Sequence, residues 1–307
     1  MDRRVAWVTG AQGFVGHHLC AALHESGWVV MRFGRDTAAG NHSAVLPLSA
    51  PGFIRAVALQ GMPERVFHLA GGATVGQSLA DPLGDFDNNV RTTALVLDAV
   101  RQFCPNSPVI LASSAAVYGS SYPGAIPTDA VLQPYSPYGH HKRMAEQLAL
   151  AYAESFGLRL SVLRLFSIYG PGIRKQLLFD ICTQLAKGDG PVRLGGTGRE
   201  RRDWCHVADV VRAMTALTSP LAGQVETLNL GTGKGLAIRD VASLLIQVWG
   251  GTRQIVFSGQ SRPGDPFSLI AAPDSLPPGF SPQIEVAEGF ALFVDWFRAD
   301  QMAETQA

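Results

Sequence analysis

The fold of this chain is decided by Val5-Ala6-Trp7-Val8-Thr9-Gly10-Ala11-Gln12-Gly13-Phe14-Val15-Gly16. Residues 5–9 are strand-like, three glycines follow with the spacing G-x-x-G-x-x-G, and a helix is expected over residues 17–26. Glycines permit a tight turn and a close approach of the backbone to a pyrophosphate, which the amides of a helix N-terminus can bind. We therefore predict a dinucleotide-binding loop. The alternative, a plain turn between strand and helix, is disfavoured because the loop follows a strand directly.

Strand-like and helical segments alternate from this loop to about residue 170. The helix that carries Tyr138 has Ser136 as its expected N-cap and Pro137 in its first turn. Further strands are expected over residues 28–33, 66–70, 109–112 and 158–166, and a further helix over 90–103. This alternation predicts an α/β fold, a Rossmann-type doubly wound parallel sheet with helices on both faces. Its ligand is expected at the carboxyl ends of the strands.

Beyond residue 170 the pattern becomes irregular and rich in glycine and proline. We expect residues 1–170 to form the dinucleotide-binding domain, with segments near 205–235 returning to it. Residues 205–207 and 228–231 are expected to rejoin the main sheet. Residues 171–204 and 236–307 are expected to form a smaller C-terminal substrate-binding domain.

Composition limits the functional classes. The chain has 307 residues, of which 47% are hydrophobic and 16% charged, so it can bury a large core. Its formal net charge is zero and it has no basic run, which disfavours nucleic-acid binding. We see no leader-like segment and no apolar run long enough to span a bilayer, so no membrane partner is expected. The cysteines fit neither a zinc site nor a disulfide framework, which predicts a reduced cytoplasmic protein without a metal; they are Cys20, Cys104, Cys182 and Cys205.

Tyr138 and Lys142 are four residues apart and therefore share one face of a helix. A lysine charge beside a phenol is expected to lower the tyrosine pKa from its usual value of about 10. The tyrosine can then move a proton near neutral pH. With Ser114 and a nicotinamide nearby, the pair predicts an alcohol–ketone redox site. The alternative, an ordinary surface pair on a helix, is disfavoured by the glycine loop and Ser114.

The chain resembles the extended short-chain dehydrogenases/reductases, in the NAD(P)-dependent nucleotide-sugar epimerase/dehydratase/reductase group. The matching motifs run in family order over nearly the whole chain. Each is weak alone, and together they are specific. They lie at residues 9–16, 68–71, 88–90, 113–119, 138 with 142, 169–171, 202–209, 229–233 and 262–265.

The resemblance implies a role for each matching residue. Tyr138 would exchange the proton of the sugar oxygen, Lys142 would hold the nicotinamide ribose, and Ser114 would hydrogen-bond the same sugar oxygen. The implied cofactor-binding residues are Gly10, Gln12, Gly13, Phe14, Val15, Gly16, Arg35, Leu69, Ala70, Asn89, Tyr138 and Lys142. The implied substrate-binding residues are Ser114, Ser167, Arg202, Arg262 and Asp265. Arginine suits a diphosphate because it forms paired hydrogen bonds, although alone either arginine reads equally well as a solvated surface charge.

The end of the second strand departs from the pattern of NAD-binding relatives. An acidic residue there hydrogen-bonds the adenosine ribose, but this chain has Gly34 followed by Arg35. A missing carboxylate removes repulsion from a 2′-phosphate, and an arginine attracts it. The sequence therefore favours NADP(H), with NAD as the alternative if Asp36 serves as the acid.

A second departure concerns Ala115 and Ala116, which follow the serine. The dehydratases and decarboxylases of this group resemble one another in carrying acids there, and loss of water needs an additional acid and base. A 4,6-dehydratase is therefore disfavoured. Two enzymes remain, a 4-ketoreductase acting on an NDP-4-keto-6-deoxyhexose and a 4-epimerase with tightly bound cofactor.

Both remaining enzymes would use the same catalytic residues. Gly34 and Arg35 favour the ketoreductase, while residues 114–119 are close to the epimerase form of the motif. Ser167 stands where many relatives have an asparagine and favours neither. A third hypothesis, a non-catalytic NAD(P)-binding sensor, is disfavoured because such proteins typically lose the tyrosine or the lysine. The implied partners are a nucleotide-sugar substrate and a second copy of the chain, paired through helices 90–103 and 138–156.

Overall fold

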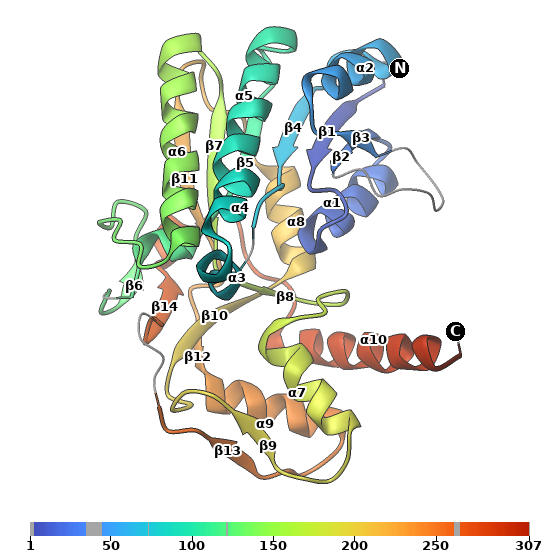
Figure 1. Cartoon of the computed structure of the whole chain (residues 1–307), viewed down its shortest axis with the longest axis vertical. Helices are drawn as coiled ribbons and strands as arrows, with labels where there is room; N and C mark the ends of the chain where they lie inside the picture. Colours follow the sequence, from blue (N-terminus) through green and yellow to red (C-terminus); the bar gives the residue numbers. More distant parts are fainter. Residues whose placement is uncertain (1–2, 35–44, 73, 121, 261–264, 307) are drawn as a thin grey trace. The chain divides into compact units, whose positions relative to one another are not determined.

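The strand Val5–Thr9 (β1) lies inside a seven-stranded sheet, between β2 and β4 (Figure 1). In the computed structural model, which describes residues 3–34, 45–72, 74–120, 122–260 and 265–306, the strand order is β11-β7-β5-β4-β1-β2-β3. The other members are β2 (Val29–Gly34), β3 (Leu46–Pro47), β4 (Arg65–His68), β5 (Val109–Ser114), β7 (Leu160–Leu165) and β11 (Val225–Leu230). The pairs from β3 across to β7 are parallel. The predicted parallel α/β sheet is confirmed.

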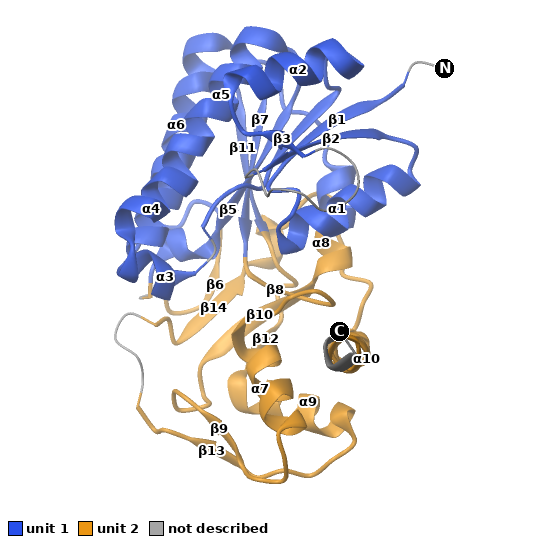
Figure 2. Ribbon diagram, turned by 45° about the vertical axis from the view of Figure 1, so that its right-hand side comes forward, with its two compact units in different colours: residues 1–119, 128–165, 211–229 blue, residues 120–127, 166–210, 230–307 orange. Residues whose placement is uncertain are grey.

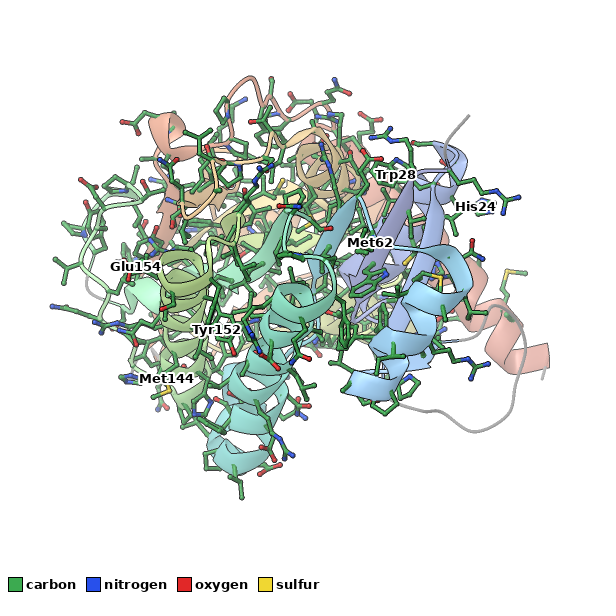
Figure 3. All side chains as sticks on the ribbon, turned by 90° about the horizontal axis from the view of Figure 1, so that it is seen from above. His24, Trp28, Met62, Met144, Tyr152 and Glu154 are labelled. Carbon is green, nitrogen blue, oxygen red and sulfur yellow. The ribbon has the colours of Figure 1, made fainter. Side chains whose placement is uncertain are left out.

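Helices cover both faces of this sheet. Seen from above in Figure 3, α2, α5 and α6 lie along one face and α1 along the other. Their bounds are α1 (Phe14–Glu25), α2 (Ala50–Gln60), α5 (Thr92–Phe103) and α6 (Pro137–Phe156). Shorter helical segments are α3 (Val75–Ala80), α4 (Pro82–Phe86), a π-helical turn (Asp87–Arg91) and a 3₁₀ turn (Ala115–Tyr118).

Helix α6 begins and ends as its sequence predicts. Ser136 Oγ accepts a hydrogen bond from Gly139 N at 3.2 Å, and Pro137 occupies the first helical position. The helix ends at Gly157, whose φ of 70° is the left-handed conformation that glycine adopts easily. This start places Tyr138 in the first turn and Lys142 one turn later.

The sheet is held to its helices by a buried apolar core. Trp7 and Phe33, on neighbouring strands, pack against Phe53 of α2, with ring centroids 4.7–5.4 Å apart. All three side chains are fully buried. This core fixes β1 and therefore the loop that follows it.

The chain divides into two compact units, coloured separately in Figure 2. The first contains residues 1–119, 128–165 and 211–229, and the second contains 120–127, 166–210 and 230–307. In helix α8 (Val207–Ala216), residues 207–210 belong to the second unit and residues 211–216 to the first. The assignment of dinucleotide binding to one domain and substrate binding to the other stays a prediction.

The second unit has its own sheet, in the order β12-β10-β14-β6, with β8 also paired to β10. Its strands are β6 (Ala125–Ile126), β8 (Ser167–Tyr169), β10 (Arg201–His206), β12 (Gly235–Ala237) and β14 (Ser268–Ala271). A two-stranded ribbon joins β9 (Val192–Leu194) to β13 (Ile255–Phe257). The unit's helices are α7 (Gln176–Ala186), α9 (Ile238–Trp249), α10 (Val286–Gln306) and a 3₁₀ turn (Pro273–Ser275).

One expected strand position is wrong. Residues 205 and 206 belong to β10, which pairs with β8, β12 and β14 rather than with the main sheet. Cys205 pairs with Ile168 of β8, the strand that follows β7 in the chain. Residues 228–230 do rejoin the main sheet, as β11.

Candidate active site

The glycine loop leaves no room for side chains. A methyl group on Gly16 would lie 2.1 Å from Gly10 O, and one on Gly10 would lie 2.7 Å from Ala70 N. Gly10 also has a φ of 68°, which favours glycine. The loop therefore brings Gly10, Gly16, Leu69 and Ala70 into contact, four of the residues predicted to bind the cofactor.

Helix α1 starts at Phe14, three residues before its predicted start, with Gly13 as its N-cap. Gly13 provides no side-chain cap, so the first amides of α1 are available to an anion. Gln12 belongs to the same loop, and its Oε1 would lie 2.8 Å from a methyl group on Gly34. The loop and helix start therefore fit the pyrophosphate of a dinucleotide.

Ser114, Tyr138 and Lys142 converge at the carboxyl end of β5. Ser114 is the last residue of that strand, and its side chain hydrogen-bonds that of Tyr138. Its Oγ also accepts from Ala116 N at 3.2 Å. Lys142 is buried, and its Nζ donates to Ala112 O at 3.0 Å. The structure thus places the three predicted catalytic residues together.

The pKa of Tyr138 differs from the prediction. Burial raises the pKa of the Tyr138 phenol, the hydrogen bond with Ser114 lowers it, and the carboxylate of Asp85 raises it further. The net direction is upward, so the expectation that Lys142 lowers this pKa is wrong. The reason is that desolvation of the phenolate outweighs the favourable contacts, and the Lys142 ammonium points to a backbone carbonyl.

Lys142 itself titrates unusually easily for a lysine. Burial lowers its pKa from 10.5 to about 8, while the nearby Asp85 and Glu146 carboxylates oppose that change. Desolvation disfavours the charged amine, and opposite charges favour it. The charge of Lys142 near neutral pH therefore depends on its acidic neighbours.

Asn89 lies in the π-helical turn, a feature frequent at functional sites. Its Nδ2 donates to Asp85 O at 3.0 Å. Its Oδ1 is buried and has no hydrogen-bond partner among the described residues. A methyl group on Gly71 would meet both Asn89 Oδ1, at 2.6 Å, and Lys142 Nζ, at 3.0 Å. Asn89, which was predicted to bind the cofactor, therefore lies beside Lys142 with an acceptor unused.

The sequence did not reveal a buried network that supports the serine. Glu146 accepts a hydrogen bond from Ser113, the neighbour of Ser114, and from Arg164 Nη2 at 2.8 Å. Arg164 also donates to Tyr118 OH at 2.8 Å. The spacing of Glu146 from Lys142, one helical turn, is the signal that would have indicated it. This network ties the end of β5 to α6.

The second unit contains a cavity of about 360 Å³. Arg202 lies in its wall, and Arg202 Nη2 donates to Asp265 Oδ1 at 2.7 Å. The lining residues are Gln176, Leu177, Asp180, Leu194, Gly195, Gly196, Glu200, Arg202, Ile238 and Asp265. Two of the predicted substrate-binding residues are therefore in one place.

Three other predicted binding residues do not join this cavity. One of them lies elsewhere in the second unit, and two are outside the described residues. Ser167 is in β8, opposite Trp204 of β10, and is not among the residues that line the cavity. Arg35 and Arg262 lie outside the described residues, as does the alternative acid Asp36.

The described residues contain neither a membrane-spanning helix nor a cluster of metal ligands. None of their helices is long and apolar enough to cross a membrane. No group of three or more histidine, cysteine, aspartate or glutamate side chains in the same part of the chain is arranged to hold a metal ion.

Comparisons with known proteins agree with the site. Residues 6–231 match the family described as NAD dependent epimerase/dehydratase. The UDP-glucose 4-epimerase of Azospirillum brasilense is 29% identical over 330 residues, covering 98% of this chain and 94% of its own. The dTDP-glucose 4,6-dehydratase of Streptomyces griseus is 31% identical over 311 residues, covering 94% of this chain and 93% of its own.

A solved structure shows the same fold. The UDP-glucose 4-epimerase of Thermus thermophilus, in complex with NAD, superposes with a TM-score of 0.83 at 28% identity, covering 96% of this chain and 99% of its own. The resemblance found in the motifs is therefore confirmed, and the chain belongs to the NAD dependent epimerase/dehydratase family.

Proposed function

We propose that this protein is an NAD-dependent 4-epimerase of a nucleotide-linked hexose. The convergence of Ser114, Tyr138 and Lys142 supports alcohol–ketone chemistry, and the likeness to 4-epimerases is the observation that carries the choice of epimerisation. The site has the groups needed to move a proton at a sugar hydroxyl. It lacks acids at the two positions after the serine. Relatives named as 4-epimerases over nearly the whole chain support the same activity.

The chain's own residues perform the proton transfer. Tyr138 Oη removes the proton from the sugar O4 as the alcohol is oxidised and returns it as the ketone is reduced. Ser114 Oγ, hydrogen-bonded to Tyr138, orients that oxygen. Lys142 would hold the nicotinamide ribose, and the glycine loop with the start of α1 would hold the pyrophosphate. When bound, an oxidised nicotinamide would supply the acceptor for the hydride that leaves the sugar C4. Its ring would also carry a positive charge.

Dehydration is disfavoured by the side chains around the serine. Ala115 is buried and Ala116 half-buried in the 3₁₀ turn, and neither can give or take a proton. Two nearby acids are already hydrogen-bonded, Glu146 to Arg164 and Asp85 to His141. The likeness to a 4,6-dehydratase therefore extends to the fold and the shared catalytic residues, but not to the acids that elimination needs.

The comparisons favour the epimerase over the ketoreductase that the sequence favoured. That preference rested on Gly34 and Arg35 as a signature of exchangeable NADPH. The Thermus relative, solved with NAD, is an epimerase. We therefore propose NAD as the cofactor. NADP(H) remains the competing choice, decided by whether Arg35 contacts a 2′-phosphate.

The cavity of the second unit supports nucleotide binding. We propose that Arg202 binds the substrate diphosphate and that Asp265 contacts the nucleotide ribose, with Arg262 as a second phosphate ligand. A guanidinium forms paired hydrogen bonds with phosphate oxygens, and Arg202 is already oriented by Asp265. Ser167 stays a predicted contact to the sugar nucleotide.

We also propose a homodimer that pairs through α5 and α6. Exposed apolar side chains on α6, among them Met144, support this pairing. The cysteines are buried and form no disulfide among the described residues, and the cytoplasmic location inferred from them stays a prediction.

The proposal is tested with a panel of UDP- and dTDP-linked hexoses, UDP-glucose first. The protein is incubated as purified, without added cofactor, and the products are identified by NMR. We expect the C4 epimer of at least one substrate. A 4-keto-6-deoxy product would indicate a dehydratase instead. NADPH consumption with 4-keto sugars, without epimer formation, would restore the ketoreductase. Cofactor binding without turnover would support the sensor.

A further inference from the structure

Asp85 and His141 form a buried pair that the proposed chemistry does not use. Asp85 lies in α4 and His141 in α6, and Asp85 Oδ2 is 2.6 Å from His141 Nδ1. Their side chains are 4% and 12% exposed. An ionised carboxylate only accepts hydrogen bonds, so His141 Nδ1 carries the proton and donates. The imidazole also packs edge-on against Phe86, with centroids 5.6 Å apart. The ring is thus fixed, and it fixes the carboxylate.

The pair lies next to Lys142 across two glycines. A methyl group on Gly71 would lie 3.0 Å from Lys142 Nζ, and one on Gly72 would lie 2.3 Å from Asp85 Oδ1. The ammonium and the carboxylate therefore pack against adjacent residues of one backbone segment. The carboxylate acts on the buried amine as a nearby opposite charge, which favours the charged form of the amine.

We propose that Asp85, held by His141, is a positioning residue that keeps the Lys142 ammonium charged and in place to bind the cofactor ribose. This inference rests on the proposed function, because that function gives Lys142 the ribose. It adds a residue and a partner that the motif of serine, tyrosine and lysine does not contain.

The other groups around Lys142 leave Asp85 as the main source of negative charge. From α6, Glu146 is paired with the permanent charge of Arg164 at 2.8 Å, so its field is largely cancelled. From β4, His68 stays neutral, because burial and the nearby Lys142 lower its pKa to about 3. Tyr138, also on α6, has a raised pKa and is neutral. His141 on α6 and Asp85 on α4 complete the titratable groups described around the amine.

The test measures the affinity of the complete chain for NAD by calorimetry between pH 6 and 9.5. In the unmutated protein the affinity should fall as the pH rises through about 8, where Lys142 loses its proton. In Asp85→Asn the fall should begin about 1 pH unit lower, because a nearby opposite charge shifts a pKa by about that much or more. The matched control is Asp87→Asn, which removes an exposed carboxylate on the next turn. Its profile should coincide with that of the unmutated protein.

A second pair of variants covers the case in which Asp85→Asn does not fold. His141→Ala removes the donor and should move the profile in the same direction by a smaller amount. His141→Asn retains an N–H near the Nδ1 position and should restore the profile. A folded Asp85→Asn whose profile matches the unmutated protein would overturn the proposal. The proposal would also be overturned if the His141 variants changed the stability of the protein but left the pH profile of NAD affinity unchanged.

This measurement separates the inference from the proposed function. It needs cofactor but no sugar, so it can succeed even if no hexose is epimerised. Failure of the sugar panel with a displaced pH profile would reject epimerisation and leave the role of Asp85 in place. Epimerisation of a sugar with an undisplaced pH profile would support the proposed function and reject the role of Asp85.

Discussion

At Tyr138, burial and hydrogen bonding act in opposite directions on the pKa, and burial prevails. Ser114 provides the hydrogen bond that favours the phenolate, whereas Asp85 disfavours it. The phenol is therefore the form held in the site, and the positive charge that an oxidised nicotinamide would bring when bound would favour its ionisation. The proton-transfer role of Tyr138 depends on this balance.

Replacing Tyr138 by phenylalanine tests that role. Tyr138→Phe removes the phenol and keeps the ring, so turnover should fall by about two orders of magnitude or more while the fold survives. The matched control is Tyr152→Phe, which removes a phenol further along α6, where the ring contacts Phe156. Steady-state kinetics and circular dichroism measure the two effects. Near-normal turnover in folded Tyr138→Phe would reject the assignment.

His68 gives a stability prediction with a definite sign. It is buried and hydrogen-bonded to Thr9 Oγ1 at 2.7 Å and Thr93 Oγ1 at 3.0 Å. Burial and Lys142 lower its pKa from 6.5 to about 3. The unfolded chain therefore binds a proton at higher pH than the folded chain. As the pH is lowered from 6.5 to 3, the free energy of unfolding should therefore decrease. This group contributes up to about 1.4 kcal/mol per pH unit to that decrease.

Denaturant titrations at several pH values check this. His68→Gln should reduce the slope of unfolding free energy against pH in that window, whatever it does to stability at pH 7. The control His24→Gln removes an exposed imidazole near the end of α1, labelled in Figure 3, and should leave the slope unchanged. Equal slopes in all three proteins would contradict the buried neutral state of His68.

The catalytic residues were predictable, and their electrostatics were not. The spacing of Tyr138 and Lys142 predicts a shared helix face, and the position of Ser114 after an apolar strand predicts the sheet edge. The direction of the Tyr138 pKa depends on burial and on Asp85, which is distant in the chain. A sequence pattern does not report such a distant charge.

Helix α6 connects the catalytic residues to the proposed dimer surface. Its inner face carries Lys142 and the buried alanines, while Met144 is 42% exposed. Figure 3 shows Met144 on α6 and Met62 next to α2. A face of this kind is stabilised when it is buried against a second copy.

A charge on that surface should prevent pairing. We expect light scattering to give a dimer for the unmutated protein and a monomer for Met144→Glu, because an unpaired carboxylate is costly to bury. Met62→Glu is the matched control, since Met62 is 65% exposed and lies away from α6, and it should remain dimeric. A monomeric unmutated protein, or a dimeric Met144→Glu, would rule out this pairing.

The elements were predicted best where the signals are local. The N-cap and first turn of α6 were found because Ser136 and Pro137 act within a few residues. The strand expected to end at residue 112 continues to Ser114, because Ser113 and Ser114 pair with Arg164 and Leu165 of β7. The partners of β10 were not predicted either, because strand pairing joins segments that are distant in the chain and leaves no local signal.

For the molecule as a whole, the sequence predicted the family and the parallel sheet and left the reaction open. Ketoreduction and epimerisation use the same three residues, so no arrangement of Ser114, Tyr138 and Lys142 separates them. The feature that favoured ketoreduction, Arg35, lies outside the described residues. The relatives favour epimerisation, and only the fate of the hydrogen at C4 distinguishes the two reactions directly.

That fate is measured with a nucleotide-linked hexose that carries deuterium at C4. The protein is incubated as purified, without added cofactor, and the products are followed by NMR. A 4-epimerase keeps this hydrogen within its site, where an oxidised nicotinamide would serve as the hydride acceptor, whereas Tyr138 exchanges only the hydroxyl proton. We predict that the C4 epimer accumulates and retains deuterium at C4. Loss of the deuterium to solvent, or an epimer that forms only as NADPH is consumed, would contradict the proposed function.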